Sequence, residues 1–167
     1  INAFRPMRFV AKSDVEKWPI FGWMARQLGT IFINRHSKRH GRQVAGEVGE
    51  ALKAEVVCIF PEGTSTVGNA VLPFRSNLFE SAVIAQVPVY SLAISYRCPK
   101  SGMRSEAPAF VGDMGLLESM ANLFRNPGLE ARLTFLPPSG ATPAVSRDRK
   151  WLALHSQEAI SECLKAG

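Results

Sequence analysis

The stretch Val56-Val57-Cys58-Ile59-Phe60-Pro61-Glu62-Gly63-Thr64 joins an uninterrupted apolar run to a polar corner. An apolar run of this length that ends at a proline predicts a strand buried on both faces, as in parallel sheets. Glu62 is placed to accept hydrogen bonds, and Gly63 permits close approach of a second backbone or a ligand. The stretch therefore predicts an α/β fold with a candidate binding corner, and the alternative for Pro61–Thr64 is an ordinary turn.

Helical spacings and short apolar runs alternate along the rest of the chain, which predicts a layered α/β domain. Its central sheet is expected to be largely parallel or mixed and to be flanked by helices. The 167 residues are enough for one domain, and we assign 1–167 to it. Strands are predicted at Met7–Ala11, Thr30–Asn34, Val56–Phe60, Pro88–Tyr96 and Ala131–Leu136; helices are predicted from a capping box at Ser13 and Glu16, and at Ile20–Leu28, Gln43–Lys53, Asn77–Ala85, Leu116–Phe124 and Arg147–Lys165.

The positive charge of the chain is concentrated in its first third. The whole sequence has a net charge of +6, and residues 1–54 hold ten Lys and Arg against four acids. Such a basic segment predicts a polyanionic partner, either phosphate groups, an anionic membrane surface or nucleic acid. Nucleic acid is the least favoured of these, because aromatic residues make up 9% of the sequence and no stacking pattern is interleaved with the basic residues.

Cysteine content and hydropathy restrict the class of protein further. Three cysteines cannot close a disulfide framework, which favours a reduced, intracellular-facing domain. The apolar stretches fall short of the ~18 residues that a membrane-spanning helix needs. Cys58 lies in the middle of a predicted strand and is interpreted as an inert buried thiol.

The corner Phe60-Pro61-Glu62-Gly63-Thr64 resembles the Phe-Pro-Glu-Gly-Thr block of the glycerolipid acyltransferase family, which includes the 1-acylglycerol-3-phosphate and lysophospholipid acyltransferases. Gly29-Thr30-Ile31-Phe32-Ile33-Asn34-Arg35 is similar to the family block Gly-x-x-Phe-Ile-Asp/Asn-Arg. Val87-Pro88-Val89 and the strand after it are similar to a fourth block. These blocks follow the family's order and spacing between about Arg5 and Tyr96.

The resemblance implies transfer of a fatty acyl group from acyl-CoA or acyl carrier protein to the hydroxyl of a lysolipid, in phospholipid biosynthesis. The acyl thioester is a co-substrate, and no other cofactor is implied. The residues that the resemblance assigns to acceptor binding are Arg35, Glu62, Gly63 and Thr64, with Ser65 and Arg75 added as candidates. They are expected to meet at neighbouring sheet edges, because ligands of open α/β sheets bind beyond the carboxyl ends of strands, and an Arg fork pairs with phosphate oxygens.

Ser65 departs from the family pattern, since many members carry Arg after the Thr of this block. 1-Acylglycerol-3-phosphate is the acceptor expected first, and the Ser variant leaves lyso-ornithine lipid as the alternative. Arg75 is a candidate replacement for the missing cation. His36 and His40 are four residues apart, but Gly41 and the basic neighbours argue against a metal site, and none is predicted.

A second departure concerns the catalytic base, which in the family is the His of a His-x-x-x-x-Asp motif. The residues five positions after His36, His40 and His155 are Gly41, Ala45 and Ile160, so the motif does not occur between residues 1 and 167. We therefore assign no catalytic residue and expect the motif in a segment upstream of Ile1. A non-catalytic module that binds lipid headgroups stays open as an alternative.

The expected location is the cytoplasmic face of a membrane, either through peripheral contact or through segments outside this chain. Basic charge and apolar side chains would supply the peripheral contact with an anionic surface. Trp18, Phe21, Trp23 and Met24 surround Pro19 and predict an interfacial patch or acyl-chain wall, with packing in the core as the alternative.

Overall fold

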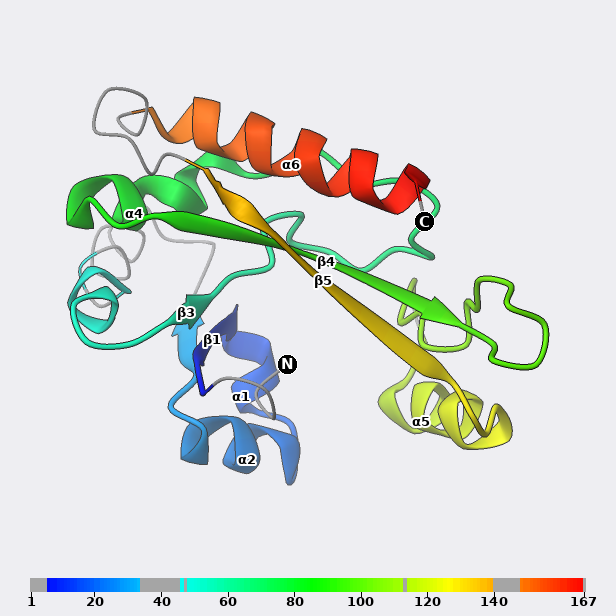
Figure 1. The fold of residues 1–167 in the computed structure, drawn as a ribbon. Coiled ribbons are helices and arrows are strands. Elements are labelled where there is room, and N and C mark those ends of the chain that lie inside the picture. Colours follow the sequence, from blue (N-terminus) through cyan, green and yellow to red (C-terminus); the bar gives the residue numbers. More distant parts are fainter. Residues whose placement is uncertain (1–5, 34–45, 47, 113, 140–147, 167) are drawn as a thin grey trace. The chain divides into compact units, whose positions relative to one another are not determined.

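The computed structural model describes residues 6–33, 46, 48–112, 114–139 and 148–166, and its fold is α/β with a parallel sheet (Figure 1), as the sequence predicts. The chain divides into two compact units that alternate along the sequence. One unit takes the described residues within 1–61, 75–89 and 140–153, and the other takes those within 62–74, 90–139 and 154–167.

The first unit is built on three parallel strands in the order β2-β1-β3, with β1 (Arg8–Lys12) in the centre. Strand β2 (Ile31–Ile33) pairs with it in the register Val10–Ile31 to Lys12–Ile33, and β3 (Val57–Cys58) pairs at Arg8–Val57 and Phe9–Cys58. Parallel strands need crossover connections. Helices α1 (Ser13–Glu16) and α2 (Phe21–Gln27) connect β1 to β2, and residues 48–52 are helical before β3.

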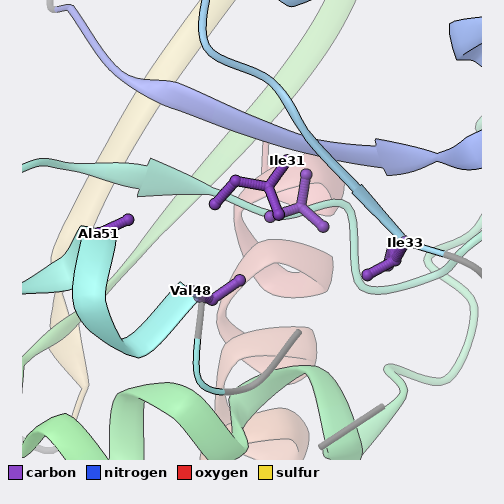
Figure 2. Close-up of a cluster of buried hydrophobic side chains, with 5 residues drawn as sticks. Ile31, Ile33, Val48 and Ala51 are labelled. Atoms are coloured by element: carbon purple, nitrogen blue, oxygen red, sulfur yellow. The ribbon is translucent and has the colours of Figure 1, made fainter. Parts of the chain in front are cut away.

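The core of this unit lies between the sheet and the helical residues 48–52. It consists of the buried side chains Val10, Ile31, Ile33, Val48 and Ala51, four of which are labelled in Figure 2. Val48 and Ala51 are three residues apart and therefore lie on the same helix face. Burial of an aliphatic side chain of the size of Ile contributes about 1.5–3 kcal/mol, so this cluster is what holds the short strands together.

The region between β1 and β2 differs from the sequence prediction in its capping. Helix α1 begins at Ser13, but Lys12 is its N-cap residue and no side chain caps the helix, so the predicted capping box at Ser13 is wrong. Pro19 separates the two helices as expected. Ile20, the residue after it, has φ of +65°, and α2 ends before Gly29, which has φ of +66°.

The remaining helix elements of the first unit are η1 (Ser76–Phe79) and α4 (Glu80–Ala85). The second unit contains β4 (Val89–Arg97), α5 (Leu116–Arg125) and β5 (Glu130–Ser139). The first residue of β4, Val89, is the exception, because it belongs to the first unit. Strands β4 and β5 form a separate two-stranded sheet, in which β5 runs back along β4 from the end nearest α5 (Figure 1). Helix α6 (Arg149–Ala166) contributes residues to both units.

Strands β1, β2 and β4 differ from their predicted bounds by one residue at each end, and β3 and β5 differ by more. Strand β3 is limited to Val57–Cys58, because its partner β1 pairs with it at two positions. Strand β5 continues to Ser139, through the two prolines that the sequence prediction placed in a connection. In β4, Ser91 and Ala93 are both buried, which is the two-residue period of a strand with one covered face.

Candidate functional site

The carboxyl ends of the first unit's strands lie at one edge of the sheet, because all three strands are parallel. Strand β2 ends at Ile33, shortly before Arg35. Arg35 lies outside the described residues, so its expected meeting with the Glu62–Thr64 corner stays a prediction. Strand β3 leads through Phe60 into the corner, and the Phe60 ring stacks on Phe9 of β1 with ring centroids 6.2 Å apart.

The corner is the first part of a loop over residues 61–75, whose two ends are joined by a backbone hydrogen bond. The N–H of Arg75 donates to the carbonyl oxygen of Pro61 (3.0 Å), which joins the two ends of the loop. Gly63 is buried and has φ of +72°, a conformation that favours glycine at this turn. The sequence following β3 therefore makes a defined turn, and that turn presents the residues assigned to acceptor binding.

The Glu62 carboxylate helps to hold this loop. Its Oε2 accepts a hydrogen bond from the backbone N–H of Leu72, at 2.9 Å. A carboxylate has about four acceptor positions, so this bond leaves capacity for a ligand. Glu62 thus has a structural contact in the described part of the chain, and its contact with an acceptor stays a prediction.

Three of the predicted acceptor-binding side chains, Thr64, Ser65 and Arg75, are exposed. Thr64 and Ser65 follow Gly63 directly and present two hydroxyls to solvent. Arg75 closes the loop through its backbone, and its guanidinium has no hydrogen bond or ion pair among the described residues. These side chains are accessible to a ligand.

Lys12 is a candidate site residue that the sequence prediction missed. It is exposed, it is the last residue of the central strand, and it pairs in register with Ile33 of β2. A charged residue directly after an apolar run is the same signal that singles out Arg35. The predicted strand stopped at Ala11, one residue earlier, and the register needed to place Lys12 at this edge is a property of the fold.

An open groove of about 740 Å³ lies elsewhere in the first unit, between strand residues 30–32 and residues 46–55. The Arg8 side chain in its wall is already engaged, because its Nε donates to the carbonyl oxygen of Gly29 (2.7 Å) and lies 3.7 Å from Glu55. None of the described acceptor-binding candidates lines this groove.

Two of the described cysteines have pKa values that are shifted in opposite directions. Burial raises the pKa of the Cys58 thiol, as expected for an unreactive cysteine. Cys98 is half-buried, and hydrogen bonds from Ser101 and from the backbone of Lys100 lower the pKa of its thiol. No cluster of three potential metal ligands occurs in the described ranges, and His36 and His40 lie outside them.

The surface of α2 and of the residue on each side of it is strongly apolar. Ile20 is 70% exposed, Trp23 59%, Leu28 49%, Met24 45% and Phe21 36%, and we call these five residues the α2 patch. Their exposure favours the surface alternative over packing in the core; Trp18 is half-buried. Among the described helices, none combines the length and apolar composition required to cross a bilayer.

Comparisons with known proteins cover most of the chain. A family profile described as Acyltransferase matches residues 2–95. The lyso-ornithine lipid O-acyltransferase of Pseudomonas aeruginosa is 35% identical over 161 residues, which are 96% of this chain and 60% of that protein. The 1-acyl-sn-glycerol-3-phosphate acyltransferase of Neisseria meningitidis serogroup B is 33% identical over 161 residues, 96% of this chain and 62% of that protein.

A solved structure has the same fold. The 1-acyl-sn-glycerophosphate (LPA) acyltransferase PlsC from Thermotoga maritima matches with a TM-score of 0.55 and 23% identity, over 97% of this chain and 58% of that one. The chain therefore spans about three fifths of the length of these three proteins.

The bond between Glu62 and Leu72 generates a prediction about the loop itself. Replacing Glu62 with Ala removes the acceptor of the Leu72 N–H, so we expect this amide to exchange with solvent deuterium about two- to tenfold faster. Glu62→Gln keeps a side-chain oxygen and should retain most of the protection. Glu106→Ala removes an exposed carboxylate of the same unit and serves as the control. Equal Leu72 exchange in wild type and Glu62→Ala would show that the bond does not form in solution.

Proposed function

Because the chain belongs to the acyltransferase family, we propose that the full-length protein transfers a fatty acyl group from an acyl thioester to a lysolipid hydroxyl. The proposed donor is acyl-CoA or acyl carrier protein, the proposed acceptor is 1-acylglycerol-3-phosphate, and the process is phospholipid biosynthesis. The observation that carries the proposal is the corner Glu62–Ser65, a defined and accessible turn after a parallel strand, within the segment 2–95 that matches the family.

The proposed reaction forms an ester and releases a thiol. The acceptor's hydroxyl oxygen attacks the thioester carbonyl carbon, and its proton passes to a general base. The tetrahedral intermediate then collapses, the carbon–sulfur bond breaks, and the thiolate takes up a proton. The acyl group arrives on the donor, so the scheme needs no further cofactor. We assign acceptor binding, and not the base, to residues of this chain.

The acceptor's phosphate calls for cations and hydrogen-bond donors. We assign Arg35 and Lys12 to the phosphate, since they follow or end strands whose carboxyl ends share one edge. Thr64 and Ser65 supply hydroxyl donors, and Arg75 is the further cation. Glu62 and Gly63 shape the turn that presents the hydroxyls.

Lyso-ornithine lipid is the second candidate acceptor, and Ser65 is the observation that favours it. A neutral hydroxyl in the place where many family members have Arg suits a headgroup that is an amino acid rather than a phosphate. A relative named for that acceptor matches 96% of the chain. The two candidates share the reaction and differ in what the corner binds.

We also propose that the protein contacts an anionic membrane surface on the cytoplasmic side through the α2 patch. Trp and other large apolar side chains partition into the bilayer interface, where an aromatic ring buries its apolar body and keeps its polar edge hydrated. The exposed Lys12 and Lys17 lie in the same segment of the chain and would interact with acidic headgroups.

An acyl-transfer assay of the full-length protein tests the reaction. Each donor is combined with 1-acylglycerol-3-phosphate or with lyso-ornithine lipid, and we expect esterified product with at least one pair. Loss of a hydrogen-bonded charge should raise the KM for the acceptor in Arg35→Ala about tenfold or more, with the KM for the donor unchanged. Arg125→Ala, which removes an exposed charge from α5, is the control. Acceptor binding without product with either donor would support the non-catalytic module instead.

Co-sedimentation with vesicles that contain phosphatidylglycerol tests the membrane contact. The Trp23→Ala variant should bind the vesicles about tenfold or more weakly than wild type, because it lacks one interfacial aromatic side chain. Phe124→Ala is the matched control, because Phe124 is 79% exposed on α5, outside the α2 patch. Equal binding of wild type and Trp23→Ala would reject the α2 patch as the contact surface.

A further inference from the structure

The loop that carries Thr64 and Ser65 continues into a tight turn at Thr66, Val67 and Gly68. The N–H of Gly68 donates to Oγ1 of Thr66 at 3.0 Å. Gly68 has φ of +77°, which favours glycine over any other residue. The turn directly follows Thr64 and Ser65 in the sequence. A contact that orders the turn therefore also restricts the positions of these two hydroxyls.

A second segment of the same unit reaches this turn. Arg97, the last residue of β4, forms an antiparallel bridge with Arg104, and the N–H of Cys98 donates to the carbonyl oxygen of Met103 at 2.9 Å. These contacts make a short hairpin at the end of the strand. Arg104 therefore projects from a backbone that is itself held by hydrogen bonds.

The Arg104 side chain is seated on the turn. Its Nη2 donates to the carbonyl oxygen of Val67 at 3.1 Å. A Cβ added to Gly68 would collide with the same Nη2, so the guanidinium occupies the space that the missing side chain leaves. The following arm of the loop is held separately, by a bond from Gln157 Nε2 to the carbonyl oxygen of Val71 at 3.3 Å.

We propose that Arg104 is a positioning residue for the lysolipid acceptor. It touches the backbone at Val67 and acts through the turn on Thr64 and Ser65. The planar guanidinium both reaches the carbonyl oxygen and covers Gly68, which a lysine ammonium cannot do equally well. This role rests on the proposed function, because an ordered turn matters for the reaction only if Thr64 and Ser65 bind the acceptor.

Steady-state kinetics of the full-length protein with 1-acylglycerol-3-phosphate and with lyso-ornithine lipid test the role. Losing one hydrogen bond should raise the acceptor KM of Arg104→Ala about three- to tenfold, with the donor KM and kcat unchanged. Arg104→Lys should recover part of the loss, because its ammonium can still donate to the carbonyl oxygen of Val67. Arg132→Ala, which removes an exposed charge from β5 in the same unit, should behave as wild type.

An unchanged acceptor KM in a folded Arg104→Ala variant would overturn the proposal, as would an equal rise in the donor and acceptor KM. Amide exchange at Gly68 separates this failure from failure of the proposed function. If the Gly68 amide exchanges faster in Arg104→Ala than in wild type, the bond from Arg104 to the Val67 carbonyl oxygen orders the turn. Unchanged exchange overturns this part of the proposal, whether or not the wild type transfers an acyl group. A wild type inactive with both acceptors would reject the proposed function and the kinetic role that depends on it.

Discussion

The parallel pairing of β2 and β3 with the central strand β1 is the constraint on which the rest of this account depends. Parallel pairing brings the carboxyl ends of all three strands to one edge of the sheet. The short strands persist because Val10, Ile31 and Ile33 are buried against the helical residues 48–52. If either pairing were antiparallel, the residues that follow β2 and β3 would leave from opposite edges.

Three hydrogen bonds order the loop after β3. A backbone bond between Pro61 and Arg75 closes the loop, the Glu62 carboxylate binds the Leu72 N–H, and Arg104 binds the turn. Each bond is worth about 1 kcal/mol, so the order of the loop comes from their number. Glu62 and Gly63 therefore help to fold the corner, and the side chains of Thr64 and Ser65 after them are exposed.

Local sequence pattern was sufficient for the elements of the first unit and for the identity of the corner. The apolar runs before Arg35 and Glu62 predicted strands β2 and β3, and Ile31 and Ile33 of β2 are buried. The prediction that the second run is buried on both faces was wrong, because Val57 and Cys58 are half-buried and Phe60 is 54% exposed. The same patterns did not separate β4 and β5 into a second sheet, because strand pairing is set by contacts far apart in the sequence.

The missed site residues have the same physical origin. Lys12 was one residue beyond its predicted strand, and its place at the edge follows from a register with Ile33 that no local pattern encodes. Arg104 contacts Val67 across 37 residues, and nothing in the sequence around either residue signals the bond. The predicted cap at Ser13 was wrong because Lys12 takes the capping position.

The most direct measurement is the distance between spin labels at positions 35 and 64, in a full-length variant whose native cysteines are replaced. Strands two places apart in a sheet are separated by roughly 10 Å, and flexible label arms add to that separation. If Arg35 and Thr64 meet at this edge, we expect one distribution of distances centred on the order of 20 Å, which narrows when a lysolipid is added. A distribution centred at twice that distance, with no response to lysolipid, would contradict it.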